Sequence, residues 1–161
     1  MKYALITIKH KWFVFLVGLK LRVPLHLLIL HDWSKFTMAE LPHYQRQFFG
    51  KADRSLAFSM AWNHHQKCNK HHWEYWIPVT GHNRGGYADL QPLPMPEKYV
   101  REMVADWMGA GRAYEGKWPD VNNWVWLKKN QDSIFTRCHH TTVRRINKVI
   151  EQFSFGDTSK D

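Results

Sequence analysis

Apolar residues recur at helical spacing along most of the chain, and no segment shows the clear alternation of a strand. Between Thr7 and Leu21 the positions Phe13, Val14 and Val17 follow this spacing, and His10 continues the same face one turn earlier. The pattern therefore predicts a helix over residues 7–21 with His10 pointing inward.

Further helices follow from the same periodicity and from capping signals. Pro24 suits the first turn of a second helix, whose near-continuous apolar run predicts burial on most sides and which ends at His31-Asp32. Thr37 with Glu40 three residues later resembles a capping box of a short helix that breaks near Pro42. Longer helices are predicted over residues 55–76, from Pro96 to about 116, and over 132–153.

No repeat or linker divides the chain. Residues 77–96 are rich in Gly and Pro without periodicity, so we predict a long loop there that can act as a lid. Residues 156–161 are expected to fray. The fold class predicted from the sequence is all-α, a single domain over residues 1–155 with about five to six helices in a bundle.

The N-terminal region needs a check against a membrane span, because Trp12 to Leu30 is strongly apolar. Lys20, Arg22 and Pro24 interrupt this stretch, and no small-residue cleavage site follows the first apolar run. We therefore expect two buried helices, no targeting signal and no membrane partner. Two cysteines are too few for a disulfide framework, which favours reduced thiols in a cytoplasmic protein.

Charge narrows the class of partner. The net charge is +9 and the pI about 9.7, so the field of the protein attracts polyanions or phosphorylated small molecules. Nine tryptophans are enough that some rings can serve a ligand surface, although most are expected to fill the core.

Four of the eleven histidines fall within the stretch "HHQKCNKHHWEYW", residues 64–76. On a continuous helix His65 and His72 share one stripe, whereas His64 and His71 share the adjacent one. Either pair can face inward, and all four can contribute only if the helix breaks near Asn69. We expect one pair to be metal ligands and the other to be hydrogen-bonded structure.

A second group of potential ligands is spread over three predicted helices. His31 and Asp32 end a buried helix, His10 points inward from the preceding one, and Asp106 lies on the apolar face of a later one. A buried carboxylate needs a cation or several donors, since an isolated charge there is costly. Glu102, one turn before Asp106, is either a supporting partner or an ordinary surface acid.

The order His, His-Asp, Asp along successive helices resembles the HD-domain metal-dependent phosphohydrolases, with His10, His31, Asp32 and Asp106 at the matching positions. "HDWSK" is similar to the "HDxGK" signature of the subgroup that hydrolyses cyclic dinucleotides. This resemblance implies an HD-like helical bundle and a phosphate contact for Lys35. Two features depart from that subgroup: its "GYP" element is absent, and Glu74 comes one residue late in the "HHE" run. "HDWSKF", "NKHHWEYW" and "EMVADW" together also resemble a small phage and bacterial family of unassigned function.

The leading functional hypothesis is therefore a hydrolase of a nucleotide or another small phosphate ester, with one or two divalent ions (Zn, Mn, Fe, Co or Mg). The first ion would be held by the four HD-like residues, and the second by two of His64, His65, His71 and His72, with Asp32 bridging. Lys35 would stabilise charge on the phosphoryl group, Glu74 would act as general base, and Arg84, Trp73 and Trp76 would contact substrate.

Two alternatives remain open at the level of sequence. The positive charge and a basic last helix also suit a nucleic-acid-binding protein or a nuclease. A structural metal site in a helical interaction module, for instance one encoded by a phage, is the other alternative.

Overall fold

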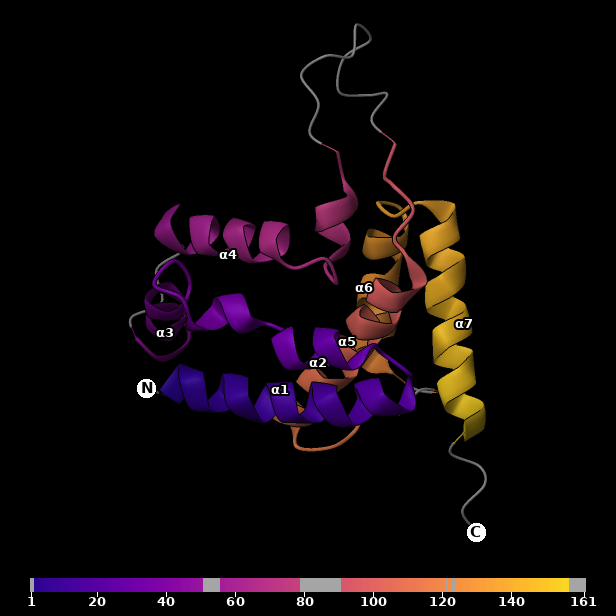
Figure 1. Ribbon diagram of the computed structural model, residues 1–161, viewed down its shortest axis with the longest axis horizontal. Coiled ribbons are helices and arrows are strands. Elements are labelled where there is room, and N and C mark those ends of the chain that lie inside the picture. Colours follow the sequence, from indigo (N-terminus) through magenta and orange to yellow (C-terminus); the bar gives the residue numbers. More distant parts are fainter. Residues whose placement is uncertain (1, 51–55, 79–90, 121, 123, 157–161) are drawn as a thin grey trace, which may run out of the picture.

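The computed structural model describes residues 2–50, 56–78, 91–120, 122 and 124–156. Within these ranges the chain forms seven α-helices and two short 3-10 helices, without any β-strand (Figure 1). The elements are α1 (Lys2–Lys20), α2 (Leu25–Leu30), η1 (Trp33–Phe36), α3 (Leu41–Phe49), α4 (Leu56–Cys68), η2 (Trp73–Trp76), α5 (Glu97–Glu115), α6 (Val125–Phe135) and α7 (His140–Gly156). The predicted all-α class is confirmed.

The main core forms where α5 packs against α1 on one side and α7 on the other (Figure 1). Val14 and Val17 of α1 meet Met103, Val104 and Met108 of α5, all of them buried. Gly109 permits the close approach, because a Cβ at this position would lie 2.8 Å from the backbone nitrogen of Val14. α1 and α5 are thereby held at a short, fixed separation.

A smaller apolar cluster joins the other end of α1 to α3 and α4. It consists of Tyr3, Tyr44 and Ala61, and the ring of Tyr3 stacks on that of Tyr44 with centroids 5.1 Å apart. In Figure 1, α4 lies above α1 and α3 fills the space between them at the left. The polar residues between α1, α4 and α5 therefore have apolar packing on both sides.

α5 agrees with the prediction almost to the residue. Pro96 is its N-cap residue, and Gly116 ends it with φ 77°, a left-handed conformation that glycine adopts without strain. The first helix begins at Lys2, five residues earlier than expected. The second spans only Leu25–Leu30, and of its six residues Leu28 alone is buried, so the expected burial on most sides is wrong.

The predicted capping box is also wrong. Thr37 follows η1, and its hydroxyl donates to the carbonyl of Ser34, while α3 starts later, at Leu41. Pro42 lies in the first turn of α3, where its missing N–H costs nothing, and so does not break the helix. Glu40 is the N-cap residue of α3, but its side chain makes no capping hydrogen bond and the residue is completely buried.

Two long predicted helices are interrupted. α4 ends at Cys68, because the side chain of Asn69 donates to the carbonyl of His65 and the chain then turns. The predicted helix over 132–153 is in fact α6 and α7, separated at residues 136–139. His139 accounts for this break, because its ring nitrogen accepts a hydrogen bond from the backbone N–H of Thr141 in the first turn of α7.

The predicted loop agrees with the structure where it is described: residues 91–96 are irregular, and residues 79–90, including Arg84, lie outside the described ranges. None of the described helices is both long and apolar enough to cross a membrane.

Candidate metal centre

Histidines and carboxylates from five parts of the fold converge: α1, the α2–η1 turn, the residue before α3, the end of α4 with the turn after it, and α5. Most are buried, and His72 and Asp106 are partly buried. The members are His10, His31, Asp32, Glu40, His65, His71, His72, Glu102 and Asp106. The HD-like residues and the histidine cluster thus belong to one centre.

Four of these residues, which we call set A, bring one donor atom each to a common point. Set A consists of His10, His31, Asp32 and Asp106. Nε2 of His10 lies 3.3 Å from Oδ2 of Asp32 and 2.9 Å from Oδ1 of Asp106. Nε2 of His31 lies 3.6 and 3.4 Å from the same two oxygens, and 3.5 Å from Nε2 of His10.

These spacings fit a divalent ion. Donors about 2.1 Å from a metal are about 3.4 Å apart in a tetrahedral shell and about 3.0 Å apart in an octahedral one. Set A spans 2.9–3.6 Å, so a shared ion needs little rearrangement of its ligands. The sequence prediction that these four residues meet is confirmed.

A second group of residues, which we call set B, surrounds the other carboxylate oxygen of Asp32, Oδ1. Set B consists of Asp32, His65, His71 and His72. Oδ1 of Asp32 lies 3.4 Å from Nε2 of His65 and 3.4 Å from Nε2 of His71. Nε2 of His72 is 2.9 Å from Nε2 of His65. Asp32 therefore lies between the two sets, with Oδ2 facing one and Oδ1 the other.

Two atoms of set B lack the partners that burial normally requires. Neither Oδ1 of Asp32 nor Nε2 of His71 has a hydrogen-bond partner within the described part of the chain, although both are inaccessible to solvent. Buried polar atoms are nearly always satisfied, and these two atoms face each other at 3.4 Å. A cation between them would satisfy both.

Asp32 holds its position through an unusual backbone. Its φ of 54° lies in the left-handed region, which non-glycine residues seldom adopt and which Asp and Asn tolerate best. This turn separates α2 from η1 and directs the fully buried carboxylate between the two sets. Backbone strain at a buried functional group is common in binding sites.

Glu102 orients two of the histidines. Its Oε1 accepts from Nδ1 of His31 at 3.1 Å and lies 3.3 Å from Nδ1 of His71, which leaves Nε2 of each ring facing Asp32. A carboxylate behind a histidine ligand fixes its tautomer and raises its basicity. Of the two readings that the sequence allowed for Glu102, the ordinary surface acid is wrong, since this acid is buried and contacts His31 and His71.

Glu40 orients His65 in the same way and was missed in the sequence, where it was assigned to a helix cap. Its Oε2 lies 2.9 Å from Nδ1 of His65, and the hydroxyl of Ser34 is 3.1 Å from the same nitrogen. The amide of Asn69 donates to that hydroxyl at 2.9 Å. Local periodicity contains no signal for a contact between residues 25 positions apart.

His64 points elsewhere. Its Nδ1 lies 2.8 Å from Oε1 of Glu40, and its Nε2 is 3.4 Å from the thiol of Cys68, so it belongs to neither set. The break at Asn69 brings His71 and His72 back beside His65, and three of the four clustered histidines therefore meet Asp32. The expected division into the pairs 64/71 and 65/72 is not observed, because both pairs assumed an unbroken helix, whereas the break near Asn69 that the sequence also allowed is present.

A pair of substitutions separates these roles. We expect His65→Gln to remove the ion of set B and leave that of set A, because the amide cannot replace Nε2 facing Asp32. Bound metal per chain, measured by elemental analysis, should fall from about two to about one. His64→Gln is the matched control and should keep both ions. Equal losses in the two variants would contradict this assignment.

The electrostatics of the centre favour ionised carboxylates. Burial alone would raise the pKa of Asp32, but the nearby charges of His31, Lys35 and His65 hold it well below the ordinary value. Burial alone would lower the pKa of His71, but its contacts with Asp32 and Glu102 raise this pKa to about 10. The raised pKa of His71 thus follows from its position between two carboxylates.

Lys35 lies at the edge of set A. Its ammonium group donates to Oδ2 of Asp32, and its side chain retains 14% exposure. Glu74 lies on the outer side of set B, with Oε2 3.8 Å from Nδ1 of His72, and its Oε1 accepts from Gln66. Burial raises the pKa of Glu74. The general-base role predicted for Glu74 stays a prediction.

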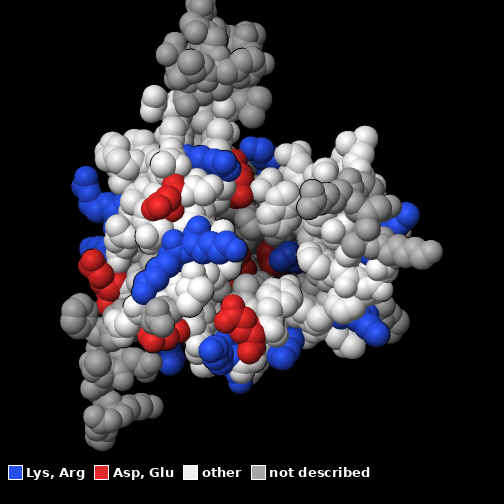
Figure 2. Space-filling view, turned by 180° about the vertical axis from the view of Figure 1, so that it is seen from behind, with Lys and Arg blue, Asp and Glu red and all other residues white. Residues whose placement is uncertain are grey.

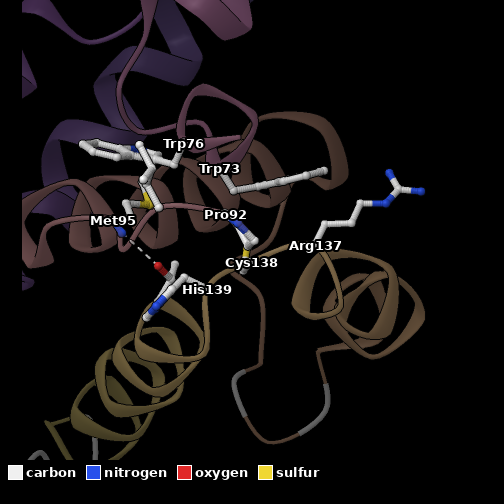
Figure 3. A pocket seen from close by; sticks show the side chains of 9 residues that line it. Trp73, Trp76, Pro92, Met95, Arg137, Cys138 and His139 are labelled. Carbon is white, nitrogen blue, oxygen red and sulfur yellow. Dashed lines mark hydrogen bonds between the residues drawn. The ribbon is translucent and has the colours of Figure 1, made fainter. Parts of the chain in front are cut away.

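The predicted substrate contacts Trp73 and Trp76 lie in η2, directly after His72. They line a narrow pocket with Met95, Cys138 and other residues of the segments around α7, and the guanidinium of Arg137 lies 5.8 Å from the centre of the Trp73 ring (Figure 3). The indole of Trp76 donates to the carbonyl of Lys70 and packs on Tyr99. Both rings are partly buried, so part of their surface serves the core.

The centre is not sealed from solvent. Asp106 keeps 15% of its side chain exposed. The face opposite to that of Figure 1 contains a hollow with acidic atoms at its floor and Lys or Arg side chains around it (Figure 2).

Comparisons with known proteins place the chain in a family without assigning it an activity. No curated protein and no solved structure matches it. The model of one family, described as a family of unknown function, matches residues 1–152. Since this match covers nearly the whole chain, the protein belongs to the family of unknown function DUF5662.

Proposed function

We propose that this protein is a metal-dependent phosphohydrolase acting on a nucleotide or another small phosphate ester. The observation that carries the proposal is the position of Asp32, whose two carboxylate oxygens face two separate donor sets. Carboxylate-bridged pairs of ions are typical of enzymes that displace groups at phosphorus. The order His10, His31-Asp32, Asp106 along the chain, which resembles the HD-domain phosphohydrolases, supports the same proposal.

The donor atoms favour a borderline metal. Set A offers two imidazoles and two carboxylates, and set B three imidazoles and one carboxylate. Imidazole suits Zn, Fe and Co better than Mg, which prefers oxygen, and Mn accepts mixed sets. A bound divalent ion would polarise a phosphoryl oxygen and lower the pKa of water from about 15.7 toward about 7.

The protein side chains would position these ions and the substrate. Glu102 and Glu40 hold His31, His71 and His65 with Nε2 facing Asp32. Lys35 is the cation at the edge of set A, and it would pair with a phosphoryl oxygen once an ion takes over Oδ2 of Asp32. Trp73, with Arg137 above its ring, would contact a base or sugar beyond set B.

The location of the protein is part of this proposal. Cys68 and Cys138 are both free thiols, as expected of a protein that works in the reducing cytoplasm. Phosphorylated metabolites are abundant substrates there, and the net charge of +9 would attract them.

The test combines metal analysis with phosphate release. The purified protein should contain about two equivalents of Zn, Mn, Fe or Co, or bind them when they are added to chelated protein. Phosphate or nucleotide release would be measured with a panel of nucleoside mono-, di- and triphosphates, cyclic dinucleotides and an oligonucleotide. A metal-free protein whose Asp32→Ala variant matches the parent in every assay would exclude the proposal, and activity on the oligonucleotide alone would point to a nuclease.

Lys35 allows a separate test of transition-state stabilisation. We expect Lys35→Met to lower kcat by about 10²–10³-fold, because a charged donor beside the phosphoryl group would be lost. Metal content should not fall, since removing a positive charge next to Asp32 does not oppose cation binding. Steady-state kinetics and elemental analysis of the same sample check both expectations. Arg46→Met, in α3, serves as a control for general loss of positive charge.

A further inference from the structure

The outward face of α1 is apolar along its whole length. Leu5, Ile8, Trp12 and Leu19 are between 50% and 67% exposed, and they occupy the side of the helix opposite to His10 and Val14, which are buried. A surface helix ordinarily places charged and polar residues on that side. α1 is therefore apolar toward the core and toward solvent.

α2, which packs against α1, also carries exposed apolar residues. Ile29 and Leu30 are 58% and 60% exposed. α2 packs against α1 at Gly18, where a side chain would collide with Leu28, and Lys11 of α1 donates to the carbonyl of Ile29. We call Leu5, Ile8, Trp12, Leu19, Ile29 and Leu30 the outer α1–α2 surface.

This part of the chain is also strongly basic. Residues 1–31 contain five Lys and Arg residues and no Asp or Glu. The first two acids, Asp32 and Glu40, are completely buried in the metal centre. Lys9 and Lys20 are exposed next to the apolar stripe of α1. Residues 1–31 therefore contribute only positive charge to the surroundings of the outer α1–α2 surface.

We propose that the outer α1–α2 surface binds the surface of a membrane that contains anionic lipids. Apolar side chains, tryptophan and flanking lysines on one helix face are the combination that suits the boundary between headgroups and acyl chains. A second copy of the chain would bring the same cations together, which disfavours self-association through this face. Helix α1 would lie in the interface, in agreement with the absence of any described helix able to span a bilayer.

Docking by this surface leaves the metal centre on the protein side of α1. His10 faces the core from the opposite side of the helix, and it is buried among His31, Asp32 and Asp106. Substitutions on the outward face should thus alter membrane binding without altering metal content.

The experiment is flotation of the full-length protein with vesicles of 70% phosphatidylcholine and 30% phosphatidylglycerol, compared with pure phosphatidylcholine vesicles. We expect binding to the anionic vesicles that is at least tenfold stronger than to the neutral ones and that weakens with salt. The triple variant Leu5→Gln/Ile8→Gln/Trp12→Gln should lose this binding by at least tenfold. Lys9→Gln/Lys20→Gln should weaken it about fivefold per lysine.

The matched control is Leu56→Gln/Met60→Gln/Val125→Gln, which removes equally exposed apolar side chains from α4 and α6 and should bind like the parent. Equal loss in both triple variants would overturn the proposal, because the binding would then not belong to this surface. Absence of vesicle binding by the parent would also overturn it. Under that outcome, light scattering that shows a dimer converted to a monomer by the α1 variant would assign the surface to a second copy instead.

Discussion

Replacing Asp32 with asparagine is expected to empty both metal sets at once and to lower phosphate release by about a thousandfold or more. Its two carboxylate oxygens face different sets, so a single neutral amide removes the charged ligand of both. Elemental analysis should show about two equivalents in the parent and close to none in Asp32→Asn. A variant that keeps one ion would show that Asp32 does not bridge.

Asparagine is the informative substitution at this position because of the backbone. At φ 54° asparagine is tolerated nearly as well as aspartate, whereas alanine adds strain. Asp32→Asn therefore changes the charge with little effect on the turn, which circular dichroism should confirm. Asp132→Asn, on the exposed side of α6, is the control for loss of a carboxylate elsewhere. A loss of metal in both variants would indicate a general effect on the fold.

Two residues of set A, His10 and Asp106, were predictable from the sequence because each lies on a helix with a clear inward face. Helical periodicity placed His10 with Val14 and Val17 on α1, and Asp106 with Met103 on α5. The resemblance of the order His, His-Asp, Asp to the HD-domain phosphohydrolases added His31 and Asp32 to this group. The same reasoning gave the bounds of α5 almost exactly, since Pro96 and Gly116 mark its ends.

The geometry of set B was harder to predict from the sequence, because it depends on where α4 ends. The stripes of a continuous helix separate His71 from His65, but the turn at Asn69 brings them together around Asp32. Glu40 could not be found in this way, since its partner His65 is distant in sequence. Long-range hydrogen bonds between buried polar groups leave no periodic trace.

The prediction that the first two helices are buried was wrong for a related reason. Hydropathy along α1 and α2 indicates a preference for an apolar environment, but it does not specify which neighbour provides it. The core covers Val14 and Val17, while Trp12 and Ile29 face outward. A sequence that is apolar on both sides of a helix is compatible with burial in the core and equally with one face bound to a partner.

Fold and centre are coupled at the contact between α1 and α5. His10 lies one turn before Val14, and Asp106 lies one turn before Gly109, where the two backbones approach closely. Nε2 of His10 and Oδ1 of Asp106 are 2.9 Å apart across this contact. The separation of the helices therefore sets the spacing of two ligands of set A.

Gly109→Ala is consequently expected to reduce both stability and activity. The added Cβ would meet the backbone of Val14, which cannot move aside, so we expect the free energy of unfolding to fall by about 1–3 kcal/mol despite the higher helix propensity of alanine. Displacing His10 from Asp106 by about 1 Å should lower phosphate release by about a hundredfold. Denaturant unfolding and kinetics at saturating metal measure the two effects.

Gly111→Ala is the control on the same helix, because its Cβ meets only the ring of Pro119 in an irregular segment that can shift. If the two variants lose stability and activity equally, the close approach of α1 and α5 does not determine the geometry of the centre.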